Sequence, residues 1–122
     1  MVHLIFCLRR LPHLSRAEFQ RYWREQHGPL VRAQAAALGI KRYVQAHTID
    51  PPLSQAIAAT RNAPDPFDGV AELWFDWDDL TAGMRTPAAI EAGRVLLEDE
   101  QRFIDLPHSP IFLADDHVVV AG

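Results

Sequence analysis

The chain of 122 residues lacks several features that define large classes of protein. It holds one cysteine, Cys7, so no disulfide can form within it, and a reducing compartment is expected. It has no run of about 20 apolar residues that could cross a membrane. Residues 1–10 alternate in character, where a signal peptide would show an apolar block and a cleavage site. These absences predict a cytoplasmic protein without a membrane partner.

Sequence motifs for phosphate, nucleotide and metal binding are also missing. There is no glycine-rich phosphate loop, no dinucleotide fingerprint and no nucleophile elbow. The six histidines form no pair at helical i, i+4 spacing, so we predict neither a metal site nor a cofactor. A formal net charge of −4 argues against a nucleic-acid partner, because such partners usually need a basic surface.

What is present is the composition of an ordinary soluble protein, with 48% hydrophobic and 23% charged residues. The length fits one domain over residues 1–122. Hydrophobic periodicity predicts strands over 2–8, 40–49, 69–77 and 111–120, the last broken near 115–116, with helices over 15–38, 54–60 and 87–100. This β-α-β-(short α)-β-α-β order predicts an α+β ferredoxin-like sandwich, an antiparallel sheet with helices on one face.

Helix boundaries carry their own signals. Ser15 and Glu18 stand three apart, which is the capping-box spacing at a helix start. Gly39 is placed to end that helix as a C-cap. Asp78 and Thr86 are expected as N-caps, and Pro87 suits the first helical position after Thr86.

The third strand has large apolar residues on both of its faces, with Glu72 between Val70 and Trp74. An antiparallel sheet with one wet face should instead alternate apolar and polar residues. Something should therefore cover the second face, and the sequence offers no spare helix. A second copy of the same sheet is the simplest cover, so we predict a homodimer.

His27 is the first candidate for chemistry. It lies at the edge of the apolar stripe of the first helix, directly before Gly28 and Pro29. Pro29 cannot donate a backbone hydrogen bond, so the helix should bend near Glu25 and aim the ring. With a pKa near neutrality, this histidine could give and take a proton. The alternative is a histidine that only satisfies a carbonyl freed at the bend.

Glu72 is the second candidate catalytic residue. A charged group in mid-strand is seldom buried without a partner, and burial would raise the pKa of its carboxyl group. It could then orient His27 or move a proton. The alternative is a salt bridge to Arg42 or Lys41, or a place on a polar rim.

A substrate-binding wall is predicted from the second and third strands. Tyr43, Gln45 and His47 share one strand face and, with Trp74, would give aromatic surface with a few polar handles. Trp23, on the helix that carries His27, completes the predicted wall. The alternative is that these side chains are ordinary half-exposed strand residues without a role in binding. Ile5 and Cys7 are expected on the same inner face.

Acidic residues gather around Phe103, where Asp99 and Glu100 end a helix and Asp105 follows. Acids are unfavourable at a helix C-terminus, so they should have cationic partners, for which Arg9 and Arg10 are candidates. A structural role is the interpretation for this cluster. Asp68, before Gly69, is interpreted as a turn residue.

Three stretches resemble the EthD-domain family. They are Phe19-x-x-Tyr22-Trp23-x-x-x-His27-Gly28-Pro29-Leu30-Val31, then 68–75 (Asp-Gly-Val-Ala-Glu-Leu-Trp-Phe), and Asp99-Glu100-x-x-Phe103-Ile104-Asp105. The resemblance implies a dimeric α+β barrel, in which two ferredoxin-like protomers join sheet to sheet and each holds a cavity between sheet and helices. It also implies that the family histidine is His27 and its strand acid Glu72. The proline-rich insert 50–68 departs from the family pattern.

The superfamily so implied includes cofactor-free cyclases, quinone-forming monooxygenases, isomerases and haem peroxidases. We therefore expect a small cofactor-free enzyme acting on an aromatic, quinone or polyketide-like small molecule, with His27 moving a proton beside a carbonyl. An alternative is a non-catalytic small-molecule-binding accessory of an oxidative or biosynthetic pathway. Haem binding is a third reading, resting on the superfamily alone, since no histidine lies in a convincing ligand context.

Overall fold

A computed structural model describes residues 1–83 and 85–122, and its centre is one antiparallel sheet. The strands are β1 (Val2–Leu8), β2 (Arg42–His47), β3 (Gly69–Phe75) and β4 (Ile111–Ala114), in the order β2-β3-β1-β4. The helical elements are α1 (Arg16–Tyr22), η1 (Trp23–His27), α2 (Gly28–Leu38), α3 (Pro52–Thr60), α4 (Trp77–Gly83), α5 (Pro87–Glu100) and η2 (Leu106–His108). This confirms the α+β, ferredoxin-like sandwich.

Local sequence signals fixed most element boundaries. Ser15 caps α1 with the full capping box to Glu18, and Gly39 ends α2 with a left-handed φ of 72°. Thr86 accepts a hydrogen bond from the Ala89 N–H at the start of α5. Asp78 is the exception among the expected caps. It lies inside the first turn of α4, because that helix already begins at Trp77.

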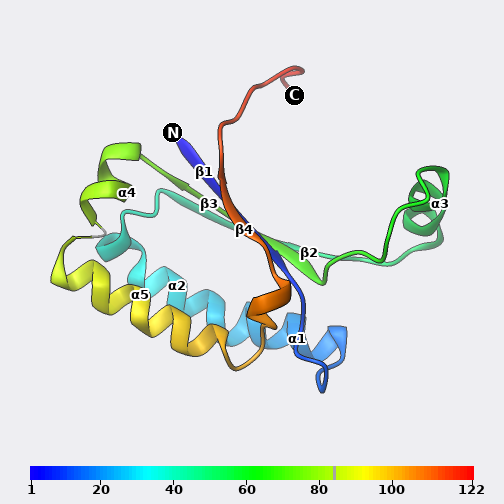
Figure 1. Ribbon diagram of the computed structural model, residues 1–122, viewed down its shortest axis with the longest axis horizontal. Coiled ribbons are helices and arrows are strands. Elements are labelled where there is room, and N and C mark those ends of the chain that lie inside the picture. Colours follow the sequence, from blue (N-terminus) through cyan, green and yellow to red (C-terminus); the bar gives the residue numbers. More distant parts are fainter. Residues whose placement is uncertain (84) are drawn as a thin grey trace.

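The helices α1, α2 and α5 cover one face of the sheet, as Figure 1 shows. In the described part of the chain, no helix lies over the other face. The core between sheet and helices is formed by apolar residues from β1, β3 and the helical layer: Phe6, Leu8, Phe19, Trp23, Ala71, Phe103 and Ile104. Fully burying each large side chain of this kind contributes roughly 1.5–3 kcal/mol.

Strand register decides which residues face the helices. Tyr43 pairs with Leu73 and Gln45 pairs with Ala71, and all four point to the helical side. The alternate pairs, Arg42 with Trp74 and Val44 with Glu72, point to the open side. Ile5 lies opposite Glu72 on the next strand, and Cys7 lies opposite Val70, so both are also on the open side. The expectation that Ile5 and Cys7 share a face with Tyr43 is therefore wrong.

The segment between β2 and β3 forms an arm that carries α3 away from the sheet (Figure 1). No residue of α3 is buried. The last strand is shorter than expected, since it ends at Ala114 before Asp115 and Asp116. The Asp116 carboxylate instead contacts His3 Nδ1 at 2.9 Å and accepts a hydrogen bond from Trp74 Nε1 at 3.1 Å. These contacts fix the start of the C-terminal tail against the open side of the sheet.

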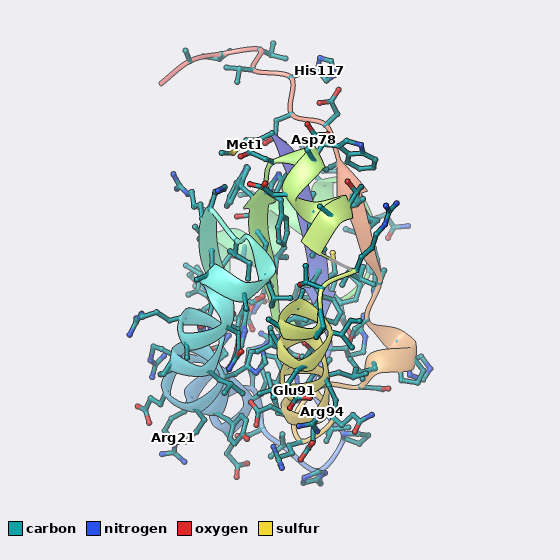
Figure 2. All side chains as sticks on the ribbon, turned by 90° about the vertical axis from the view of Figure 1, so that its left-hand side faces the viewer. Met1, Arg21, Asp78, Glu91, Arg94 and His117 are labelled. Carbon is teal, nitrogen blue, oxygen red and sulfur yellow. The ribbon has the colours of Figure 1, made fainter. Side chains whose placement is uncertain are left out.

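The solvent side of α5 is charged. Arg94 pairs with Glu91 and with Glu98, each at 2.7 Å, and Figure 2 labels Glu91 and Arg94 on this helix. Such exposed pairs contribute little to stability, because water screens the attraction between the charges. No helix in residues 1–83 and 85–122 has the length and apolar character needed to cross a bilayer.

Candidate functional site

His27 ends a π-helical turn, η1, between α1 and α2. Pro29 has no N–H, so the regular helical ladder cannot continue through it. The Gly28 N–H reaches back to the Trp23 carbonyl, which closes the wider turn. The bend expected at this proline is thus built as a π-turn. His27 is placed on its inner side and is only 5% exposed.

The His27 ring is held by Asp99, near the end of α5. The distance between His27 Nδ1 and Asp99 Oδ2 is 2.8 Å, and both side chains are buried. The other oxygen, Asp99 Oδ1, accepts hydrogen bonds from the Tyr22 hydroxyl at 2.6 Å and from Arg102 at 3.0 Å. The carboxylate therefore has donors on both oxygens, and it sets the orientation of the imidazole.

The protonation states follow from this arrangement. Burial alone would raise the pKa of Asp99, but hydrogen bonds from Tyr22, His27 and Arg102 outweigh it and hold that pKa below its ordinary value. Burial lowers the pKa of His27, against the opposing effect of Asp99. At neutral pH the ring is therefore uncharged and Asp99 is ionised. The proton then sits on Nδ1, which donates to Asp99, and Nε2 is left as a free base.

His27 lines a small cavity of about 150 Å³ between the sheet and the helices. Its walls are mostly apolar and come from both layers: Leu4, Phe6, Leu8, Trp23, Val31, Tyr43, Ala71, Leu73, Leu96, Ile104 and Ile111. A concave apolar space with a few polar groups is the usual form of a small-molecule site. Apart from His27, the titratable residues of its lining are Tyr43 and Glu100.

Glu100 is the second titratable group of the cavity. Burial, with a smaller effect from the neighbouring Asp99 carboxylate, raises the pKa of Glu100 to about 7. Its carboxyl group can therefore hold or release a proton near neutral pH. A base with lowered pKa and an acid with raised pKa on one cavity is the pattern typical of acid–base sites.

A chain of hydrogen bonds runs from two residues of the cavity wall, Trp23 and Tyr43, to Gln45 and His47, which lie outside the wall. Gln45 Nε2 donates to the Trp23 carbonyl and to the Tyr43 hydroxyl, both at 2.9 Å, and Trp23 Nε1 donates to the same hydroxyl at 3.2 Å. His47 Nε2 lies 2.8 Å from Gln45 Oε1, and the His47 ring packs on Trp23. Gly28 makes room for this chain, because a Cβ there would lie 3.2 Å from Gln45 Nε2.

Of the residues predicted to bind substrate, Trp23 and Tyr43 line the cavity with His27. Gln45 and His47 contact these two residues but do not line the cavity. Trp74 does neither, since it pairs with Arg42 and lies on the open side of the sheet. There it stacks on His3 at a centroid distance of 4.1 Å. Predicting Trp74 as part of the Tyr43 wall was therefore wrong in geometry, because neighbouring positions along a strand face opposite ways.

Glu72 also lies on the open side. Its carboxylate is 3.6 Å from His3 Nε2, and its side chain is 32% exposed. The expected partnership of Glu72 with His27 is therefore corrected: Asp99 is the carboxylate that contacts His27. The alternative partners, Arg42 and Lys41, do not pair with Glu72 either, since Arg42 lies over the Trp74 ring and Lys41 pairs with Asp76 and Asp79.

Sequence reasoning missed Asp99 and Glu100 as functional candidates. Both stood out as acids at a helix C-terminus, and that unfavourable position was the available signal. The sequence pattern predicts a structural role for both acids, with Arg9 and Arg10 as their ion-pair partners. In the structure Arg102 pairs with Asp99, whereas Arg10 pairs with the buried Asp68. Asp68 is thus more than a turn residue.

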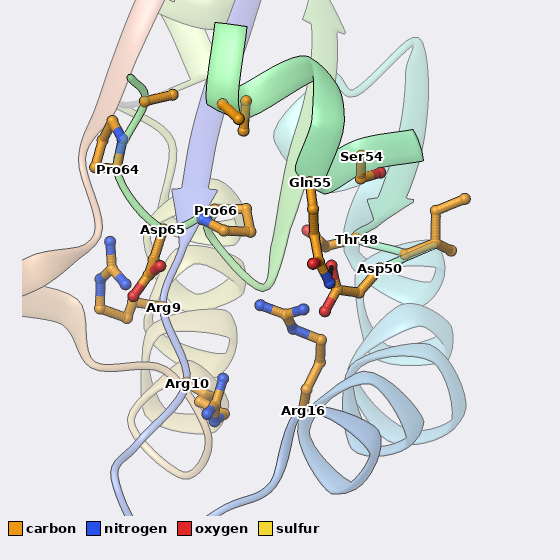
Figure 3. A pocket seen from close by; sticks show the side chains of 14 residues that line it. Arg9, Arg10, Arg16, Thr48, Asp50, Ser54, Gln55, Pro64, Asp65 and Pro66 are labelled. Atoms are coloured by element: carbon orange, nitrogen blue, oxygen red, sulfur yellow. Dashed lines mark hydrogen bonds between the residues drawn. The ribbon is translucent and has the colours of Figure 1, made fainter. Parts of the chain in front are cut away.

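A larger hollow of about 840 Å³ lies between the arm and the start of α1 (Figure 3). Arg9, Arg10 and Arg16 line it together with Asp50 and Asp65, so it carries charges of both signs. Most of the arm residues in its wall are exposed. This hollow lacks the largely apolar lining of the His27 cavity, which remains the better candidate site.

Comparisons with known proteins agree with the fold. The EthD domain family model matches residues 11–107. No curated protein matches the chain significantly. An EthD family protein from Bacillus halodurans C-125 has a similar solved structure, with 19% identity over 96% of this chain and 99% of that one and a TM-score of 0.61.

Two further solved structures are similar. One is a dimeric protein of unknown function with a ferredoxin-like fold from Bacteroides fragilis, with 10% identity over 94% of this chain and 95% of that one and a TM-score of 0.57. The other is SnoaB from Streptomyces nogalater, described as a cofactor-independent oxygenase, with 16% identity over 98% and 97% and a TM-score of 0.50. Identities this low indicate a shared fold, not a shared reaction.

Proposed function

This chain belongs to the EthD family, and from that premise and the cavity around His27 we propose a small enzyme that works by proton transfer. Its substrate is an aromatic, quinone or polyketide-like small molecule that carries a carbonyl group. His27 Nε2 removes a proton from the carbon beside the carbonyl. The resulting enolate can then cyclise, isomerise or react with oxygen, and the proton transfer itself needs no cofactor.

The observation that carries this proposal is the His27–Asp99 contact of 2.8 Å at the wall of an apolar cavity. Asp99 keeps the imidazole in the tautomer whose Nε2 can accept a proton, and the apolar walls exclude water from it. The fold likeness to SnoaB, a cofactor-independent oxygenase by description, supports small-molecule chemistry of this kind. Glu100 supplies a second group that exchanges protons near neutral pH.

The direct test is deuterium uptake by a simple ketone. Acetophenone in heavy water exchanges its methyl protons only as fast as a base removes them, and NMR follows the loss of the methyl signal. We expect the protein to accelerate this exchange. Binding of acetophenone without acceleration would contradict proton transfer and would favour the non-catalytic binding protein.

The Glu100 carboxyl should also appear in the pH dependence of stability. Its folded-state pKa of about 7 lies above the ordinary value of 4.5, so the folded chain holds this proton more tightly. Its contribution to stability is therefore complete below about pH 4.5 and is lost as the pH rises through 7. We expect Glu100→Gln, which cannot ionise, to exceed the wild type in unfolding free energy by up to about 3 kcal/mol at pH 8 but not at pH 4.

Urea denaturation at several pH values measures this difference. The matched control is Glu91→Gln on the exposed side of the same helix. Hydrogen bonds from Arg94 hold the pKa of Glu91 below its ordinary value, so its replacement should bring no gain at alkaline pH. An equal gain in both variants, or none in Glu100→Gln, would contradict a buried, proton-binding Glu100.

We propose further that the protein works as a homodimer, with the open sides of two sheets facing each other. The open side carries Ile5, Val44, Val70 and Phe112, and Phe112 is 48% exposed. The Bacteroides fragilis protein with this fold is described as dimeric, which supports the same assembly here. Glu72 and Trp74 would then lie at the interface and not in the cavity.

Sedimentation at micromolar concentration tests the dimer. We expect the wild type to sediment as a dimer and Val44→Arg to dissociate it, because a charge would be buried between the sheets. Ile90→Arg, at an exposed position on α5, should leave the dimer intact. A monomeric wild type, or a Val44→Arg protein that stays dimeric, would argue against this interface.

A further inference from the structure

The hydroxyl oxygen of Tyr43 accepts two hydrogen bonds, and its own O–H is still available to donate one. The indole N–H of Trp23 can only donate, and it does so to this oxygen at 3.2 Å. The Gln45 amide nitrogen lies 2.9 Å from the same oxygen. That nitrogen is also 2.9 Å from the Trp23 backbone carbonyl, which can only accept. The amide orientation is therefore fixed, and Gln45 too is a donor to Tyr43.

Both acceptor positions of the Tyr43 oxygen are thus filled. The remaining O–H must donate, and in residues 1–83 and 85–122 it has no hydrogen-bond acceptor of its own. Tyr43 lines the same cavity as His27 and Glu100. Burial, despite opposing hydrogen bonds from Gln45 and Trp23, raises the pKa of Tyr43, so the hydroxyl keeps its proton at neutral pH. The cavity therefore contains a donor that cannot turn into an acceptor.

We propose that Tyr43 donates its hydroxyl proton in a hydrogen bond to an acceptor oxygen of the bound molecule, and that this molecule is a single-ring compound carrying a carbonyl or phenolate oxygen. This inference rests on the proposed function, because it assigns the substrate class of the same cavity. It also gives Tyr43 a role in specificity: compounds without an acceptor oxygen leave its O–H unsatisfied in an apolar space.

The size of the cavity carries the single-ring part of the inference. An apolar protein cavity of about 150 Å³ is large enough to hold benzene. The cavity beside Tyr43 has about this volume, with aliphatic and aromatic walls. One ring with a short substituent fills such a space, whereas a fused polycyclic skeleton exceeds it. The broader polyketide class is thereby narrowed to its smallest members.

The same hydrogen bond assists the reaction. When His27 Nε2 takes the proton from the carbon beside the carbonyl, the C–H electron pair forms the carbon–carbon double bond of the enolate. The carbonyl π pair moves to the oxygen, which becomes negative, and the proton stays on His27. Tyr43 donates to that oxygen without transferring its own proton. A donor aimed where charge develops stabilises the transition state more than the ground state.

A pair of isosteric probes tests the inference by binding alone. Acetophenone carries the acceptor oxygen and ethylbenzene does not, although both have one ring and a two-carbon substituent. Isothermal titration should show that Tyr43→Phe weakens acetophenone binding about 5- to 10-fold and leaves ethylbenzene binding unchanged. Equal effects on both probes, or no effect on acetophenone, would overturn the proposed role of Tyr43.

A second measurement needs only the wild type, in case Tyr43→Phe does not fold. The infrared carbonyl stretch of bound acetophenone should lie below its frequency in hydrocarbon solvent, as a hydrogen-bonded carbonyl does. A frequency equal to that in hydrocarbon would overturn the inference. Either measurement is independent of turnover. Equal effects of Tyr43→Phe on both probes, with deuterium exchange by the wild type intact, refute only the Tyr43 assignment. An effect on acetophenone alone, with no exchange by the wild type, refutes only the proton transfer.

Discussion

Replacing His27 with glutamine should reduce deuterium exchange of acetophenone by about 10²- to 10⁴-fold, the usual contribution of a positioned general base. Glutamine can still hydrogen-bond to Asp99, so the buried carboxylate keeps a partner and the fold is preserved. No side chain in the described part of the cavity replaces the base, since Glu100 is largely protonated below pH 7 and Tyr43 keeps its proton. NMR exchange rates in wild type and variant give the ratio.

The pH profile separates a catalytic from a structural effect. Burial lowers the pKa of His27, so exchange by the wild type should already be at its plateau for this group near pH 7 and should fall at acidic pH. Asp99→Asn should also slow exchange, and it should shift this acidic limb because Asp99 is the carboxylate facing the ring. Unchanged exchange in a folded His27→Gln protein that still binds acetophenone would refute the assignment.

Replacing Asp68 with asparagine should lower the free energy of unfolding by about 1–3 kcal/mol, because the neutral amide cannot accept all of the hydrogen bonds that Arg10 and Arg16 donate to the carboxylate. The Asp68 side chain is 2% exposed and contacts Arg10 and Arg16. Its second oxygen accepts the Arg10 backbone N–H at 2.8 Å. One carboxylate thus joins the end of β1, the start of α1 and the start of β3. Urea denaturation at pH 7 measures the loss.

The effect of Asp68 also has a defined pH dependence. Burial would raise the pKa of Asp68, but hydrogen bonds from Arg10 and Arg16 outweigh it and hold that pKa below its ordinary value of 3.8. The stabilisation is therefore complete above about pH 4 and is lost as the pH falls through the folded-state pKa. The difference in unfolding free energy between the wild type and Asp68→Asn should therefore disappear at acidic pH. The exposed Asp65→Asn should change stability by less than about 0.5 kcal/mol, and a similar loss there would contradict the prediction.

The fold was largely predictable because its signals are local. The capping box at Ser15, the glycine at Gly39 and the Thr86–Pro87 start each act within one turn of helix. The strands 2–8 and 69–75 follow from apolar, β-branched and aromatic runs with glycine or proline at their ends. The start of helix α4 was expected one residue or more too late, with Asp78 as its cap, because the helix directly follows β3 and its first residue, Trp77, continues the apolar pattern of the strand.

The candidate site was only partly predictable because its contacts join distant parts of the chain. Spacing singled out His27, but its partner Asp99 is 72 residues away and no local pattern links them. The faces of β3 were ambiguous for a different reason. Both carry large apolar residues, so alternation could not tell which side meets the helices, and Glu72 was assigned to the wrong one. Only the register with β2, which pairs Tyr43 with Leu73, resolves this.

That register has a consequence for how the protein can change. Along β2, the residues at 43, 45 and 47 face the helical side, where Tyr43 lines the cavity, and those at 44 and 46 face the open side. In the proposed enzyme and the proposed dimer, ligand binding and self-association therefore depend on alternate positions of one strand. Substitutions at 43, 45 or 47 can change which ligand binds and leave the proposed dimer interface as it is. Substitutions at 44 or 46 can change the interface and leave ligand binding as it is. A fold of this kind can acquire a new substrate without any change in the surface that forms the dimer.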